Sequence, residues 1–340
     1  MPRDNPEKTP GDETGLALVG QAILAPSSHN TQPWRFRIAA NSIELHADRT
    51  RALPVNDPYD RELTISCGCA LANLVIAARH YGRLHQVEIL PQPWLHDLLA
   101  RVRLARRPGE PQPGSDLYPA IPLRRTYRMR FAERAVPPAT LEVLINAARA
   151  GGAWLLVVSE APARHALAEL IAEGDRLQWA DPRWRRELAA WMDPSRSQDG
   201  IAIAGVPAAL APAVVRTFDM GGGVGARDLS LVDESPVLAI LGTTFDTPHD
   251  WIAAGEALEM VLLSACRHGL QASFLNQPIQ VSALRERLKE RLGREGHPQV
   301  LLRLGYPGKK LPPSRRRPVG DVIERAPAKR AGAGTSPRPA

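Results

Sequence analysis

A loop near the start of the chain carries side chains of the kind that bind uncharged polar ligands. Residues 26–34 read Pro-Ser-Ser-His-Asn-Thr-Gln-Pro-Trp. The hydroxyls of Ser27 and Ser28 and the carboxamides of Asn30 and Gln32 offer neutral donors and acceptors, and the flanking prolines restrict the backbone. This set suits a planar heterocycle with polar atoms along its edges. Taken alone, however, the segment is better described as an ordinary turn before a strand.

A second segment places two guanidinium groups and a hydroxyl on one side of an extended chain. Residues 124–128 read Arg-Arg-Thr-Tyr-Arg. Alternate residues of an extended segment point the same way, so Arg124, Thr126 and Arg128 share one face. Such a row suits a phosphate and the polar chain attached to it. From this segment alone, a solvated basic turn explains the residues equally well.

A third segment lies after the last predicted strand. Residues 314–318 read Ser-Arg-Arg-Arg-Pro, and Arg315, Arg316 and Arg317 would be able to close over the same phosphate. As an isolated run of charge, the segment would more often be solvated surface.

Hydrophobic periodicity predicts helices and strands that position these segments in two halves of the chain. In the first half we expect helices at 14–24 and 64–81 and strands at 34–38, 43–47 and 86–90. In the second half we expect helices at 138–150, 163–192 (broken near Asp181-Pro182) and 253–268, and strands at 154–158, 237–241, 272–275 and 299–304. Residues 106–123 hold five prolines and are predicted to be a linker.

Two further segments are predicted to lack regular structure. Residues 193–235 are rich in Gly, Ala and Pro, and a connection of this length is typical of a lid, a binding loop or a mobile segment. Residues 324–340 are predicted to be a disordered tail because their composition is of low complexity.

The two halves share an internal similarity. Residues 67–82 (CGCALANLVIAARHYG) resemble residues 254–269 (AGEALEMVLLSACRHG) at a constant offset of 187. Small residues one helical turn apart let two helix backbones approach closely, so the pattern predicts two copies of one α+β unit packed through these helices. Chance similarity between two Ala/Leu-rich helices is the alternative.

Composition and charge exclude several classes of protein. The chain has 340 residues, of which 44% are hydrophobic and 23% charged, as in ordinary globular proteins. Its net charge of +7 resides in residues 309–340, which hold nine Lys/Arg and two acidic residues, so the rest of the chain is neutral and nucleic-acid binding is not expected. No apolar stretch reaches the roughly 18 residues of a membrane span. Three cysteines, an odd count, favour a reducing compartment, and we expect the cytoplasm.

Together, the three segments resemble the FMN-dependent nitroreductase family. Members of that family bind the phosphate, ribityl chain and N1/O2 edge of FMN with an Arg-x-Ser-x-Lys/Arg segment. A Pro-Ser-Ser-x-Asn-x-Gln-Pro-Trp loop reaches the same flavin from the other subunit of a homodimer, and a C-terminal Lys/Arg segment completes the phosphate site. Residues 26–34 match that loop at every defining position, and Arg124, Thr126 and Arg128 match the first element with Thr in place of Ser.

The order of these elements departs from that of a single-domain member, in which the Arg motif precedes the loop. A duplicated chain explains the order, because its first half keeps the loop and its second half keeps the Arg motif. The whole therefore resembles the twin-domain, Acg-type branch of the family, from about residue 14 to residue 323. The resemblance implies an α+β, nitroreductase-like sandwich whose pseudo-symmetric halves, at 14–105 and 124–323, form an internal pseudo-dimer with one complete flavin site.

The resemblance also implies roles for the basic segments. Arg124 would pair with the FMN phosphate, and Thr126 would hydrogen-bond to the ribityl chain or the O2 edge. Arg128 would sit near N1/O2 and stabilise the negative charge of the reduced flavin. The other side of the phosphate would be taken by one or more of Arg315, Arg316 and Arg317, in a register left open by one extra residue.

The remaining cofactor-binding candidates come from the loop and from the strand predicted at 272–275. The loop candidates are Ser27, Ser28, Asn30 and Gln32, which would contact the ring or ribityl chain. Ser273 and Phe274 occupy the place where family members present backbone N–H groups to flavin N5. His29 is a candidate proton donor, although a hydrogen-bonded loop histidine is the simpler interpretation.

The resemblance implies an FMN flavoprotein in which NAD(P)H donates hydride to flavin N5 and a small acceptor removes it, in a ping-pong cycle. No protein acid or base is obligatory, and no metal is expected because Cys67-x-Cys69 lacks a second pair. The alternative is a flavin storage or sequestration protein covered by a lid at 193–235. We expect a monomer with its internal pseudo-dimer, or a higher homo-oligomer.

Overall fold

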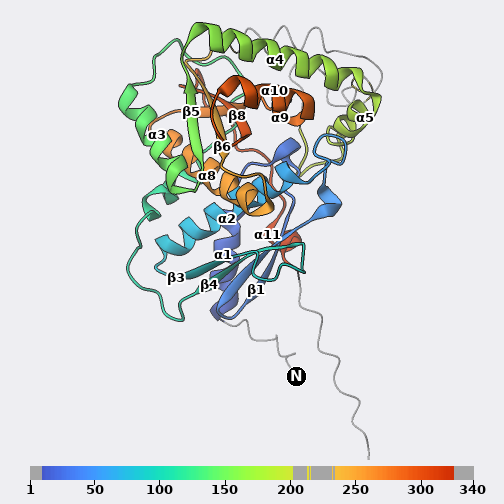
Figure 1. Cartoon of the computed structure of the whole chain (residues 1–340). Coiled ribbons are helices and arrows are strands. Elements are labelled where there is room, and N and C mark those ends of the chain that lie inside the picture. The colour runs from blue at the N-terminus through green and yellow to red at the C-terminus, as the bar shows by residue number, and fades with distance from the viewer. Residues whose placement is uncertain (1–9, 202–212, 214, 216–231, 233, 325–340) are drawn as a thin grey trace, which may run out of the picture.

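The computed structural model describes residues 10–201, 213, 215, 232 and 234–324 (Figure 1). Most of the lid predicted at 193–235 and all but the first residue of the predicted tail lie outside these residues.

The first half is one antiparallel sheet with two helices. Its elements are α1 (Pro10–Ala22), β1 (Trp34–Ala39), β2 (Ser42–Ala47), α2 (Arg61–His80), β3 (Leu84–Ile89) and β4 (Leu98–Leu104). The strands are arranged in the order β1-β2-β4-β3. Side chains alternate across β2, so that Ile43, Leu45 and Ala47 face the core while Glu44 and His46 face outward into a layer of ion pairs.

The second half repeats this arrangement and adds helices. Its elements are α3 (Pro138–Ala150), β5 (Trp154–Val158), α4 (Ala161–Ala180), α5 (Pro182–Ala190), β6 (Val237–Thr243), α8 (Pro248–Arg267), β7 (Gln271–Phe274), α9 (Gln277–Gln280), α10 (Ser282–Leu292) and β8 (His297–Gly305). The strand order, β5-β6-β8-β7, is that of the first sheet in equivalent positions, and all pairs are antiparallel. The predicted α+β fold with two halves is thereby confirmed.

Most predicted elements are present, and the differences concern the bounds of the first helix and several elements that were not predicted. The first helix begins at Pro10 rather than at Thr14 and ends at Ala22. The strand β4 and the helices α9 and α10 were not predicted. The predicted break near Asp181 is present, because α4 ends at Ala180 and the Asp181 carboxylate caps α5 by accepting a hydrogen bond from the backbone N–H of Arg183 at 2.8 Å.

The helices α2 and α8 pack against each other between the two sheets (Figure 1). The offset of 187 carries the bounds of α2, Arg61–His80, onto those of α8, Pro248–Arg267. At the crossing, a Cβ atom on Gly68 would lie 2.4 Å from the carbonyl oxygen of Ile252, and one on Gly255 would lie 2.1 Å from that of Ile65. The predicted packing of two similar helices through small residues is therefore confirmed.

One apolar core runs through both halves by way of these two helices. A second cluster fills the space between the other face of the second sheet and the helices α4, α9 and α10. Helix α2 has the length and hydropathy of a membrane-spanning helix, but 89% of its apolar window is buried inside the structure, as in the core helix of a globular protein.

Two extended segments add to the sheet edges and bring distant parts of the chain together. Thr126 forms a parallel bridge with Ala272 of β7, and the backbone N–H of Tyr127 donates to the Ala272 carbonyl at 2.8 Å. After α11 (Val319–Val322), Ile323 bridges Phe36 of β1 in the first half. The arginine row thus follows the edge of the second sheet, and the chain end crosses to the first.

Candidate functional site

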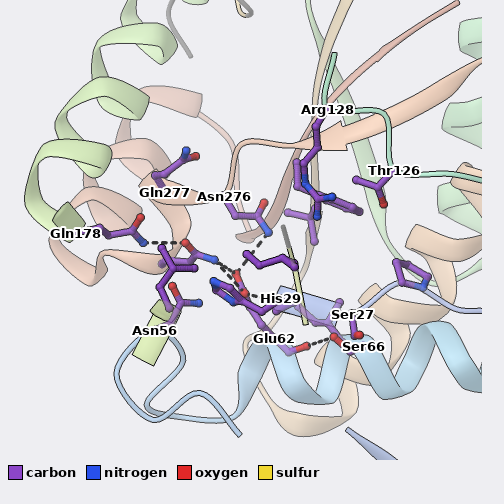
Figure 2. Close-up of a pocket in the computed structure, with 18 of the residues that line it drawn as sticks. Ser27, His29, Asn56, Glu62, Ser66, Thr126, Arg128, Gln178, Asn276 and Gln277 are labelled. Atoms are coloured by element: carbon purple, nitrogen blue, oxygen red, sulfur yellow. Dashed lines mark hydrogen bonds between the residues drawn. The ribbon is translucent and has the colours of Figure 1, made fainter. Parts of the chain in front are cut away.

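A cavity of about 370 Å³ opens where the two halves meet (Figure 2). The first half contributes Pro26, Ser27, Ser28, His29, Asn56, Glu62, Ile65, Ser66 and Cys69 to its wall. The second half contributes Thr126, Arg128, Asp175, Gln178, Trp179, Trp184, Leu188, Ile201, Leu258, Phe274, Asn276, Gln277, Gln280 and Val300. The predicted loop and two members of the predicted row, Thr126 and Arg128, therefore face one cavity from opposite halves.

The backbone of the predicted loop is strained. His29, Asn30 and Gln32 have φ angles of 51°, 55° and 51°, in the left-handed region that residues with a Cβ rarely adopt. The Ser27 hydroxyl holds this shape by accepting from the backbone N–H of Gln32 at 2.9 Å, and Gln32 is fully buried. Strain of this kind persists where the surrounding structure fixes it, and it concentrates at binding sites.

Arg128 presents a charge to the cavity without a partner. Its side chain extends into the cavity (Figure 2) and forms no hydrogen bond or ion pair with any other residue in the described part of the chain. Desolvation by the surrounding walls lowers the pKa of its guanidinium. A cation held in this way favours a ligand that carries negative charge or an electron-rich edge.

His29 is neutral at physiological pH. Burial and the neighbouring Arg128 cation lower the pKa of its imidazole to about 4. Its Nδ1 atom is buried without a hydrogen-bond partner among the described residues. The ring therefore offers hydrogen bonding to a ligand, and its role as a proton donor stays a prediction.

A buried carboxylate, Glu62, connects the two halves at the floor of the cavity. It accepts hydrogen bonds from the Ser28 hydroxyl at 2.7 Å, from Asn276 Nδ2 at 3.4 Å and from Gln280 Nε2 at 3.1 Å. Glu62 also affects a neighbouring carboxyl group. Burial and the charge of Glu62 both disfavour the ionised form of Asp57 and raise its pKa to about 6. Glu62 was not predicted from the sequence, where it is one more acidic residue in the first turn of a helix.

The helices α4 and α5 supply an aromatic wall. Trp179 and Trp184 pack edge to face with ring centroids 5.4 Å apart, and Trp184 Nε1 donates to Asn56 Oδ1 at 2.9 Å. The carboxylate of Glu187 accepts from the backbone N–H groups of Val55 and Asn56, each at 2.9 Å. The added helices thus hold a loop of the first half against the cavity.

Arg124 and Arg316 lie behind the cavity wall rather than on it. Arg124 is 6% exposed; its Nη2 donates to the Leu24 carbonyl at 3.0 Å, and its Nε lies 3.5 Å from Glu259 Oε1. Arg316 donates to the carbonyls of Leu24 at 3.0 Å and Ala25 at 2.9 Å. The two guanidinium groups therefore converge on one carbonyl at the end of the first helix.

Of the remaining predicted residues, Phe274 lines the cavity, whereas Asn30, Gln32, Ser273, Arg315 and Arg317 lie outside its lining. Asn30 Oδ1 accepts from Arg316 Nη1 at 3.1 Å, and Gln32 Oε1 accepts from the backbone N–H of Arg317 at 2.8 Å. Arg315 donates to the Arg196 carbonyl at 3.1 Å. Ser273 is buried in β7, whereas its neighbour Phe274 lines the cavity. Cys67 and Cys69 are buried in α2, and burial raises the pKa of both thiols, in keeping with the predicted packing role.

Comparison with known proteins gives relatives over nearly the whole chain. No family model matches. A protein of Mycobacterium tuberculosis strain H37Rv that is named as an NAD(P)H nitroreductase is 33% identical over 322 residues, which cover 93% of this chain and 92% of the relative. The protein of the same organism named NAD(P)H nitroreductase acg is 30% identical over 316 residues, covering 90% and 94%. Among solved structures, an FMN-dependent nitroreductase from Mycobacterium smegmatis in complex with NADPH covers 56% of this chain and 86% of its own, with 19% identity and a TM-score of 0.37.

Proposed function

Because the chain belongs to the NAD(P)H nitroreductase family, in the branch that includes acg, we propose that it is an FMN-dependent oxidoreductase. It would carry reducing equivalents from NAD(P)H to a small electron acceptor. The observation that carries this proposal is the unpaired Arg128 guanidinium, which faces the strained loop at 26–34 across a cavity built from both halves.

The residues present fit FMN. The cavity has the size of a small-molecule site, and its hydroxyls at Ser27, Ser66 and Thr126 suit the ribityl chain. Behind the wall, Arg124 and Arg316 bring two cations together, and Arg124 Nε has no hydrogen bond among the described residues. That pair suits the phosphate.

Bound FMN would supply a hydride acceptor at N5, which this set of side chains does not provide. Arg128 would stabilise negative charge at the N1/O2 edge, because a cation that faces a developing anion lowers the free energy of that anion. Ser27 and Ser28 would hold the cofactor from the first half, and His29 would remain neutral beside Arg128. Trp179 and Trp184 would exclude water from the far side.

The proposal is tested by the visible spectrum of the purified protein and by anaerobic addition of NADPH. A flavin spectrum that bleaches rapidly supports the oxidoreductase. A bound flavin that NADPH leaves oxidised supports the storage alternative instead, and a colourless protein that does not take up FMN contradicts both. Because one chain completes the cavity, we also propose that a monomer suffices for one site.

Replacing Arg124 with alanine should weaken FMN binding about 10- to 100-fold, because a charge-assisted hydrogen bond to a phosphate contributes about 1.5–3 kcal/mol. Titration of flavin fluorescence with the cofactor-free protein measures this. Riboflavin, which lacks the phosphate, should bind the variant and the wild type alike.

Arg125→Ala is the matched control for this prediction. The Arg125 guanidinium donates to the carbonyls of Pro122 and Arg124, both at 2.8 Å. Its removal should leave FMN affinity within about threefold of the wild type. Equal FMN affinity in the Arg124 and Arg125 variants would count against a phosphate contact at Arg124.

A further inference from the structure

A carboxylate with no exposed surface lies beside the two arginines behind the cavity. Glu259, in the middle of α8, is 0% exposed, and its Oε1 lies 3.5 Å from Arg124 Nε. Neither carboxylate oxygen has a hydrogen bond of ordinary geometry within the described part of the chain. A buried carboxylate with one distant ion pair is poorly compensated for the loss of water.

The groups around Glu259 come from four parts of the chain. Arg124 lies closest, and the cation of Arg316 also lowers the pKa of the carboxyl group. From α2, Asn73 is fully buried beside it. Burial and the Glu259 charge both raise the pKa of the Cys69 and Cys266 thiols, so these thiols stay uncharged at neutral pH.

The charges in this cluster balance differently with and without a phosphate. Two guanidinium groups and one carboxylate leave a single positive charge, which the Ile23, Leu24 and Ala25 carbonyls help to accommodate at Arg316. A phosphate dianion would neutralise both guanidinium groups. An ionised Glu259 would then be an uncompensated negative charge in a buried place, which is costly unless the carboxylate takes up a proton.

We propose that Glu259 is the counter-ion that the FMN phosphate displaces at Arg124, so that cofactor binding is coupled to the uptake of one proton by the Glu259 carboxylate. The proton comes from solvent, and no bond of the cofactor is made or broken. This inference rests on the proposed function, because it needs FMN as the ligand.

The titration of Glu259 supports this coupling. Burial raises the pKa of its carboxyl group to about 7 against the opposing influence of Arg124 and Asn73, so both forms are populated near neutral pH. Burial, Arg124 and Arg125 lower the pKa of Arg316 to about 9 against the opposing influence of Glu259, which still leaves it a cation at neutral pH. FMN affinity should therefore fall as the pH rises above about 7, by up to about tenfold per pH unit.

The proton uptake can be measured by titration calorimetry of cofactor-free protein with FMN near pH 8, in two buffers of different ionisation enthalpy. The second pKa of a phosphate monoester is about 6, so free FMN is already a dianion there and any proton is taken up by the protein. We expect about one proton per FMN bound and none for riboflavin. In Glu259→Gln, FMN should bind without uptake and with little dependence on pH.

Glu256→Gln is the matched control. Glu256 lies one turn earlier on the same helix, its pKa is also raised to about 7 by burial, and the cation near it is Arg79 instead of Arg124. This variant should keep the full uptake on FMN binding. Normal FMN binding without proton uptake in the wild type, or uptake that persists in Glu259→Gln, would overturn the inference and leave the proposed function standing. Failure of the wild type to bind FMN would overturn both.

Discussion

Replacing Arg128 with glutamine should slow the reduction of bound flavin by NADPH about 100-fold or more. The guanidinium is the cation that faces the cavity at the Thr126 edge, and it has no carboxylate partner among the described residues to share its charge. Removing one preorganised group that stabilises a developing anion typically costs 10²–10³ in rate. Anaerobic stopped-flow measurement of flavin bleaching tests this directly. FMN should stay bound, because Arg124 and Arg316, which we propose hold the phosphate, are unchanged.

The control for this variant lies two residues further along. Arg130 is exposed and pairs with Glu133 at 3.0 Å and with Glu234 at 3.1 Å. Arg130→Gln should therefore bleach at the rate of the wild type, since a screened surface charge has little effect on the cavity. If Arg128→Gln bleached equally fast with full flavin occupancy, the guanidinium would not lie near the charge that develops.

The parts of the site that were predictable are those with a local signal. The loop at 26–34 is dense in turn and hydrogen-bonding residues, and its polar side chains are adjacent in sequence. The alternation at 124–128 was also readable, because the segment is extended along the edge of β7 as expected. The similarity between 67–82 and 254–269 predicted the central helix pair because close helix packing requires small residues at fixed spacing.

The residues that were missed owe their place to contacts distant in sequence. Glu62 accepts hydrogen bonds from Asn276 and Gln280, which are more than 200 residues away in sequence. The residues next to each of them carry no pattern that predicts this contact. In the sequence, Glu259 is simply a polar residue within an apolar helix. Its burial follows only from the packing of α2 against α8. The sequence predicted that Arg124 and Arg128 share a face of the extended segment. It did not predict that, of these two arginines, only Arg128 lines the cavity.

Replacing Gly255 with alanine should destabilise the fold by about 3 kcal/mol and weaken cofactor binding with it. The added Cβ would lie 2.1 Å from the Ile65 carbonyl oxygen, 2.7 Å from Gly68 Cα and 2.9 Å from the Cys69 backbone nitrogen. These atoms are all backbone, so no side chain can move aside and α2 must shift relative to α8. Since α2 carries Glu62 on the floor of the cavity, that shift would displace the hydrogen bonds that join the halves.

Gly20→Ala in α1 separates this effect from the general preference of helices for alanine. A Cβ there would meet only Val319 Cγ2, at 3.9 Å, so the change should be neutral or stabilise by about 0.5–1 kcal/mol. In thermal unfolding, Gly255→Ala should melt roughly 6–12 °C below the wild type, at about 2–4 °C per kcal/mol, and Gly20→Ala at or slightly above it. Equal melting temperatures in the two variants would mean that the helices tolerate a wider separation. In that case, the close packing of α2 against α8 would not determine how far apart the two halves lie at the cavity.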